Sequence, residues 1–113
     1  MAIHLIVKKA TKKQIEDTLV ILESYIKVAV DIQNGILAAG GALHADCEAI
    51  LIEHGSKQEN IWGANWVPSQ NKVTFEALLN IAPRRKNPSM EIQNPSVRTI
   101  VEKVVRNLLE NPV

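Results

Sequence analysis

The chain has almost no cysteine, few aromatic residues and no marked excess of charge, and each shortage excludes a class of protein. With one cysteine, Cys47, no intrachain disulfide can form, so we expect a reducing, cytoplasmic location. Lysine and arginine number 13 and the acidic residues 12, and this net charge of +1 argues against a dedicated nucleic-acid binder. Two tryptophans, one tyrosine and one phenylalanine leave the core to aliphatic side chains.

Long apolar runs and the common catalytic motifs are also missing. No run approaches the roughly 20 apolar residues that cross a bilayer, so we expect no membrane partner. The apolar residues 3–7 are too few for a signal peptide. A glycine-rich phosphate loop, a Gly-x-Ser-x-Gly elbow, a Cys-x-x-Cys pair and a His-Glu-x-x-His metal motif are all absent. The length predicts one domain over residues 1–113.

Hydrophobic periodicity predicts the secondary structure. Thr11 and Gln14 form a capping-box pattern before a stripe of helical spacing, and Asn34-Gly35 is typical of a two-residue type I′ hairpin turn. Gly40-Gly41 suggests a bulge or a sharp bend. We predict strands over residues 3–8, 27–32, 36–39, 43–53, 59–67 and 73–81, and helices over residues 12–24 and from Pro95 to residue 109.

The element order β-α-β-β-β-β-β-α predicts an α+β fold. Consecutive hairpins favour a mostly antiparallel sheet of five to six strands, with the two amphipathic helices packed on one face. We expect the other face to be solvated or to close against a second copy, which makes a homodimer the expected assembly.

The residues around Cys47 form the most unusual polar segment. If residues 43–53 are a strand, His44, Asp46 and Glu48 share one face, while Cys47 points into the core. An imidazole and two carboxylates on one face could hold a divalent cation or divide acid and base roles. The alternative is an exposed sheet face, on which polar residues alternate with buried ones. Without finger-like ligand spacing, we assign no metal site.

Two further features are candidates for binding. Trp62 and Trp66 share one strand face, where they could line a ligand pocket, form a hot spot against a partner, or cover the sheet beneath a helix. Arg84 and Arg85 lie in a cationic loop between prolines and could hold a small anionic ligand, although the same loop could be only solvated. One group of three cations is too little for a surface that follows nucleic-acid phosphates.

The chain resembles a family of short, uncharacterised prokaryotic proteins, a domain of unknown function. The resemblance rests on residues 43–49 (LHADCEA), on residues 55–56 (GS) followed by residues 61–66 (IWGANW), and on residues 89–93 (SMEIQ). It extends over nearly the whole chain and implies a single domain, but no activity, cofactor or partner.

Two functions follow as hypotheses. The first is a small ligand-binding or protein-binding domain without catalysis, favoured by the tryptophan pair, the cationic loop and the missing catalytic motifs. The second is a small hydrolase or phosphoester-handling enzyme, in which His44, Asp46 and Glu48 act on a substrate held by Arg84 or Arg85. The sequence favours the first and leaves open whether the protein is an enzyme.

Overall fold

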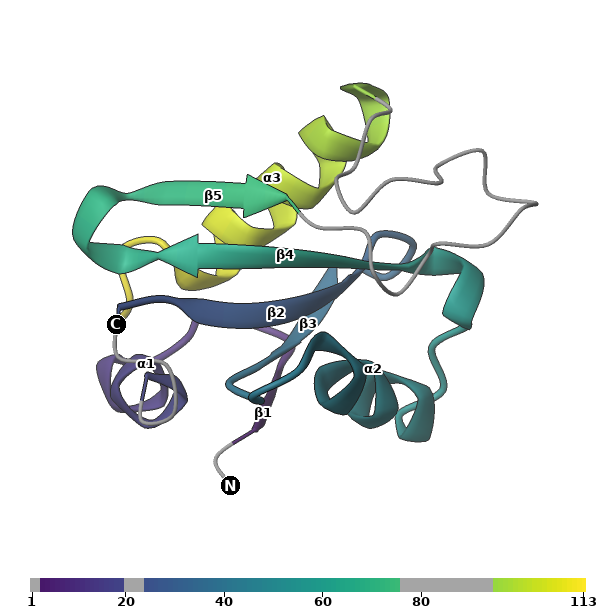
Figure 1. Ribbon diagram of the computed structural model, residues 1–113, viewed down its shortest axis with the longest axis horizontal. Coiled ribbons are helices and arrows are strands. Elements are labelled where there is room, and N and C mark those ends of the chain that lie inside the picture. The colour runs from purple at the N-terminus through teal and green to yellow at the C-terminus, as the bar shows by residue number, and fades with distance from the viewer. Residues whose placement is uncertain (1–2, 20–23, 76–94) are drawn as a thin grey trace.

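The chain folds into a five-stranded antiparallel sheet with three α-helices, in a computed structural model that describes residues 3–19, 24–75 and 95–113 (Figure 1). The sheet order is β1-β3-β2-β4-β5, and every neighbouring pair is antiparallel. This confirms the predicted α+β class and its antiparallel sheet. The strands are β1 (His4–Ile6), β2 (Ile26–Asp31), β3 (Ile36–Ala39), β4 (Ile61–Val67) and β5 (Lys72–Phe75). The helices are α1 (Lys12–Thr18), α2 (His44–Glu53) and α3 (Pro95–Leu109), with short 3-10 turns η1 (Gln58–Asn60) and η2 (Pro68–Gln70).

The predicted capping box begins α1. The Thr11 hydroxyl accepts from the Gln14 backbone amide at 3.1 Å, and the Gln14 side chain accepts from the Thr11 amide at 2.9 Å. Both contacts satisfy donors that a helix start otherwise leaves unpaired. The helix ends at Thr18 and is shorter than the predicted 12–24, since Leu19 and Ser24 lie outside it and residues 20–23 lie outside the described part.

The β2–β3 hairpin is confirmed, but its predicted two-residue turn is wrong. Asp31 pairs with Ile36, so four residues close the loop. Gly35 has a φ of 67°, whereas Asn34 is not among the residues with positive φ. The Asp31 carboxylate accepts from the Gln33 and Asn34 backbone amides at 2.9 and 3.1 Å, and these bonds favour a loop with only one left-handed residue.

Residues 44–53 form a helix, so the predicted strand over residues 43–53 is wrong. Gly40, with a φ of 107°, turns the chain out of β3. His44, Cys47 and Leu51 then recur at helical spacing and are buried, whereas other apolar residues of α2 lie on its remaining sides. A helix that is apolar on several sides has no clear period, and for this reason its sequence resembled a buried strand.

Helices cover both faces of the sheet. On one face α1 and α3 pack on a large core. This confirms the prediction that these two helices share one face of the sheet. On the other face α2 packs on a small core, so the expectation that this face is solvated or closed by a second copy is wrong. We call these the α3-side core and the α2-side core. The α2-side core consists of Ala29, Ile36, Ala38, Cys47, Leu51 and Ile61.

The C-terminal helix α3 follows the predicted stripe. It buries one face against the sheet and ends before Asn111, which has a φ of 54°. Its buried residues are Val101, Val104, Val105, Leu108 and Leu109. The predicted last strand is confirmed up to Phe75, and its remainder lies outside the described residues. Among the described segments, no helix has the length and hydrophobicity needed to span a bilayer.

Candidate functional site

The helix α2 separates the three residues that the strand prediction had placed together. Because each residue turns a helix by about 100°, Asp46 projects roughly 200° from His44, and Glu48 roughly 40°. His44 is buried, whereas Asp46 and Glu48 are partly exposed. The Glu48 carboxylate accepts from the Gln58 side chain at 3.3 Å. The premise of one shared face is therefore wrong, and the ligand-binding prediction for these residues loses its geometric basis.

The imidazole of His44 connects α2 to the sheet. Its Nε2 atom lies 2.9 Å from the carbonyl oxygen of Ala64 in β4. A carbonyl can only accept, so this nitrogen carries the proton and donates. With 2% of its surface exposed, His44 lies at an interface between elements and not in an open pocket.

Cys47 is buried, as predicted, but from a helix. Burial raises the pKa of its thiol above the ordinary value and the nearby Asp46 carboxylate adds to this, against the opposing effect of the Gly41 amide. The sulfur donates to the carbonyl oxygen of Lys27 at 3.7 Å. A Cβ at Gly41 would lie 3.2 Å from the sulfur, so this glycine makes room for α2. This environment favours the thiol form, which is a weak nucleophile.

The two tryptophans belong to the α3-side core. Trp62 is 6% exposed and Trp66 3%, and both pack in the cluster that α3 covers. The pair therefore covers the sheet beneath a helix, as one of the three predicted alternatives has it, and Trp66 also lines a cleft at the end of α3. Trp66 also lies under the guanidinium of Arg106, 5.7 Å from the ring centre.

The predicted anion-binding residues Arg84 and Arg85 lie outside the described residues. The position of Arg84 and Arg85 relative to His44 is therefore not described, and the anionic ligand stays a prediction. Within the described part of the chain, no three His, Cys, Asp or Glu side chains are grouped to hold a metal ion.

Asp31 is a polar residue that the sequence reasoning missed. It is fully buried at the end of β2, and its carboxylate accepts from the Ser56 hydroxyl at 2.6 Å and the Asn34 side chain at 2.8 Å. Burial alone would raise the pKa of this carboxyl, but the hydrogen bonds from Ser56, Asn34 and Gln33 outweigh it and lower the pKa. Asp31 thus joins the hairpin to the loop after α2. An aspartate three residues before Asn34-Gly35 was a usable signal for this turn.

The strand β1 lies at one edge of the described sheet. In the described sheet β1 pairs only with β3, through His4 with Ala39, Leu5 with Ala38 and Ile6 with Leu37. His4 points toward α1, where its Nε2 lies 3.5 Å from the Asp17 carboxylate. A strand alternates its side chains, so Ile3 and Leu5 point to the other side, where they pack at the margin of the α2-side core.

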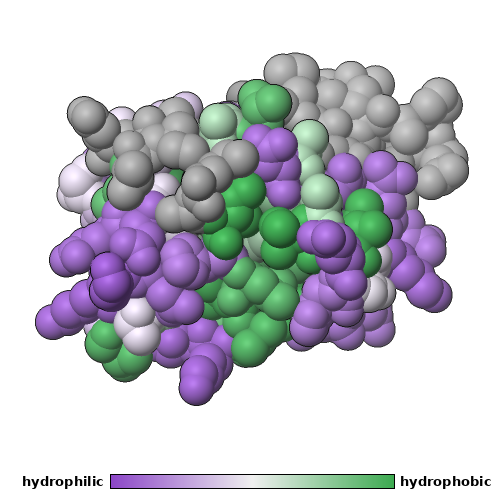
Figure 2. All heavy atoms as spheres, turned by 90° about the horizontal axis from the view of Figure 1, so that it is seen from below, coloured by the Kyte–Doolittle hydropathy of each residue, from purple (hydrophilic) through white to green (hydrophobic). Residues whose placement is uncertain are grey.

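Apolar side chains gather around this edge. Seen from the side on which β1 lies, the molecule has an apolar region in the middle with polar residues on both sides (Figure 2). Val7, directly after β1, is 55% exposed, and Leu43, directly before α2, is 60% exposed. Ile3 and Leu5 are partly exposed. We call these four residues the β1-edge surface, and their chemistry suits binding to another apolar surface.

Comparison with known proteins identifies one family. Residues 4–108 match the family model described as Protein of unknown function (DUF5674). No curated protein and no solved structure matches the chain.

Proposed function

We propose that this chain, which belongs to the DUF5674 family of proteins of unknown function, is a non-catalytic protein-binding domain that forms a homodimer through β1. The observation that carries the proposal is that β1 pairs on one side only within the described sheet and lies beside exposed apolar side chains. Such an edge has backbone groups that can pair with another strand, and natural proteins commonly cover or charge it.

The pattern of β1 is complementary to itself. If two copies of β1 pair in antiparallel fashion about Leu5, the two Leu5 residues face each other, and Ile3 of each copy faces Val7 of the second copy. Ile3 and Leu5 pack at the margin of the α2-side core, and the exposed Val7 directly follows β1, so the pairing would bring the apolar side chains of both copies together. A two-fold axis produces this pairing with the same surface on both copies.

The surroundings of the edge support the same occupant. Glu48 on α2 bonds to Gln58 in η1 and so marks the flank that faces β4. Ile50 lies roughly 200° around the helix from Glu48 and packs at the margin of the α2-side core, as Ile3 and Leu5 do. Leu43 is exposed directly before α2. Lys8 is exposed just after β1, but the two-fold axis would place the two Lys8 side chains at opposite ends of the paired strands. Repulsion between the two Lys8 side chains therefore does not oppose the dimer.

The protein-binding function is better supported than the hydrolase function. The hydrolase required His44, Asp46 and Glu48 on one face, whereas α2 turns Asp46 away from the other two and buries His44. A buried thiol without a disulfide partner suits the cytoplasmic location expected from the sequence.

Sedimentation of the Val7→Lys variant at micromolar concentration tests the dimer. Val7 is exposed in the single chain, so we expect this change to preserve folding and to shift the species from a dimer to the 12.5 kDa monomer. The matched control is Ile100→Lys on α3, an exposed aliphatic residue away from β1, which we expect to remain dimeric. A monomeric parent chain, or a dimer that both variants leave unchanged, would contradict the proposal.

Crosslinking tests the register separately. In the double variant Ile3→Cys and Val7→Cys, facing residues of two paired strands would be close enough for disulfides between the copies. We expect a covalent dimer on mild oxidation and none for Ile100→Cys. A dimer that forms no such link would show that another surface is used.

A further inference from the structure

A cleft lies at the C-terminal end of α3. It has a volume of about 460 Å³, which is in the range of sites for small molecules. Its walls come from α1, the end of β4, the turn before β5 and the residues after α3. Ile15, Trp66 and Leu109 line its apolar part, and Asn71, Glu110 and Asn111 its polar part.

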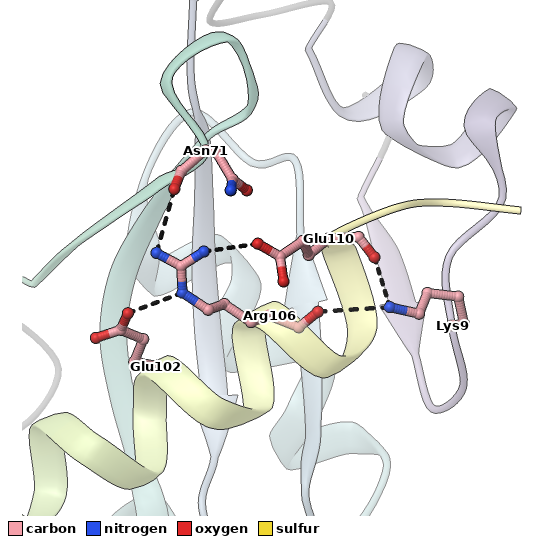
Figure 3. A network of polar contacts seen from close by, with 5 residues as sticks. All are labelled: Lys9, Asn71, Glu102, Arg106 and Glu110. Carbon is pink, nitrogen blue, oxygen red and sulfur yellow. Dashed lines mark hydrogen bonds and ion pairs between the residues drawn. The ribbon is translucent and has the colours of Figure 1, made fainter.

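Arg106 organises the polar side of the cleft (Figure 3). Its guanidinium donates to Glu102 and to Glu110 at 2.8 Å each, and to the carbonyl oxygen of Asn71 at 3.1 Å. These bonds use all three guanidinium nitrogens and join α3 to the β4–β5 turn. Each guanidinium nitrogen of Arg106 therefore has a partner within the protein, and the residue positions Glu110 and the β4–β5 turn.

Two asparagines hold unusual backbone conformations at the rim. Asn71 has a φ of 50° and Asn111 a φ of 54°, and they are the only described non-glycine residues with positive φ. Both line the cleft, one from each wall. Asparagine tolerates this conformation better than most residues, and such positions are enriched at binding sites.

The wall after α3 is fixed in place. The Lys9 ammonium donates to the carbonyl oxygens of Arg106 and Glu110, as Figure 3 shows. The Val113 amide donates to Ala10 at 3.0 Å, and the Lys12 amide donates to Val113 at 2.9 Å. A wall held at both ends is preorganised, which lowers the entropy that binding costs.

The charges of the cleft select the class of ligand. Glu110 is the one charged residue among its described lining residues, and its Oε1 atom accepts no hydrogen bond from a described residue. The nearby cations already have partners, Arg106 with two carboxylates and Lys9 with two carbonyl groups. The carbonyl end of α3 also favours positive charge. An anion would find no available cation in the lining, whereas an ammonium group would find a carboxylate and two amide oxygens.

We propose that this cleft binds a small organic cation, with its ammonium group on Glu110 and the side chains of Asn71 and Asn111, and its apolar body against Trp66 and Leu109. The site is independent of the β1 edge, because none of the β1-edge residues lines the cleft. Either proposal can therefore fail without the other.

Titration with phenethylammonium, followed by backbone amide NMR, tests the site. We expect millimolar binding, as small ligands commonly show, with shifts centred on Asn71, Glu110 and Asn111. Phenylacetate, of similar size but opposite charge, should cause no such shifts at the same concentrations. Glu110→Gln should weaken phenethylammonium binding about tenfold, because it removes a charge-assisted hydrogen bond.

The matched control is Glu102→Gln. This change also removes the negative charge of a carboxylate that bonds to Arg106 at 2.8 Å, but Glu102 does not line the cleft, so binding should change less than about twofold. Equal losses in the two variants would show that Arg106 only holds the fold, and would overturn the proposal. Shifts elsewhere, or phenylacetate binding equal to that of phenethylammonium, would overturn it as well.

Discussion

The two faces of the sheet are closed by different kinds of helix, with different means of attachment. On the α3 side, 17 buried described residues form the core beneath an amphipathic helix. On the α2 side only six do, beneath a helix with apolar residues on several sides. Hydrophobic burial scales with the area removed from water, so the smaller core contributes less.

Buried polar contacts compensate for the small core. The His44 side chain bonds to β4 at the start of α2, and Ser56 bonds to Asp31 just after its end. Each fixes one end of α2 against the sheet. Directional bonds also attach α3, through Arg106 and Lys9, so the two helices differ in how much apolar packing accompanies such bonds. The comparison teaches that a helix on a small core depends more on its directional bonds than a helix on a large one.

The largest expected effects come from the same truncation on each face. Leu37 in the α3-side core and Leu51 in the α2-side core are both fully buried. Leu37→Ala and Leu51→Ala should each lower the free energy of unfolding by about 3 kcal/mol, measured by urea denaturation. The two variants should differ in amide hydrogen exchange. Leu51→Ala should speed exchange in α2 more than in α3, whereas Leu37→Ala should not. Equal loss of protection in both helices would contradict a separate α2-side core.

A smaller effect is expected from removing the negative charge of Asp31, whose carboxylate bonds to Ser56 just after α2. Asp31→Asn should lower the free energy of unfolding by about 2 kcal/mol at neutral pH, since it weakens hydrogen bonds to a buried carboxylate. Hydrogen bonds lower the pKa of Asp31 in the folded state, so its stabilisation is present above the unfolded pKa of about 3.9 and is lost as the pH falls through the folded pKa.

Urea denaturation across the acid range measures this prediction. The difference between the parent and Asp31→Asn should shrink as the pH falls below the unfolded pKa. Ser69→Ala, an exposed serine in η2, is the control and should follow the parent at every pH. A difference that is constant with pH would show that shape, and not charge, is what Asp31 contributes.

The smallest expected effect concerns Cys47. Cys47→Ala should cost about 1 kcal/mol of unfolding free energy, because it removes one small buried group. In the parent chain, burial and the raised pKa should keep the thiol unreactive toward a disulfide reagent in the absence of urea. Leu51→Ala should speed this reaction more than Leu37→Ala does. Fast labelling of the folded parent would contradict the buried position.

The elements that the sequence predicted correctly have local signals. The capping box of Thr11 and Gln14 and the periodic stripe of α3 depend on neighbours within one or two turns. The β2–β3 hairpin likewise follows from a short alternating pattern. Such signals do not need knowledge of the rest of the fold.

The elements that it missed depend on distant partners. Residues 44–53 could be a strand or a helix by pattern, and their packing on β2 and β3 decides for the helix. The tryptophans share a face, as predicted, but only the position of α3 makes that face the core. Neither the β1 edge nor the cleft has a motif, since each combines residues far apart in the chain.

The sequence by itself determined the α+β class, the antiparallel sheet, the capped α1 and the amphipathic α3, because spacing and caps act over a few residues. Only the tertiary structure decided which face α2 covers, where His44 and Asp31 point, and which strand is left at the edge. Those features depend on contacts between residues that are distant along the chain, and local propensity contains no information about them.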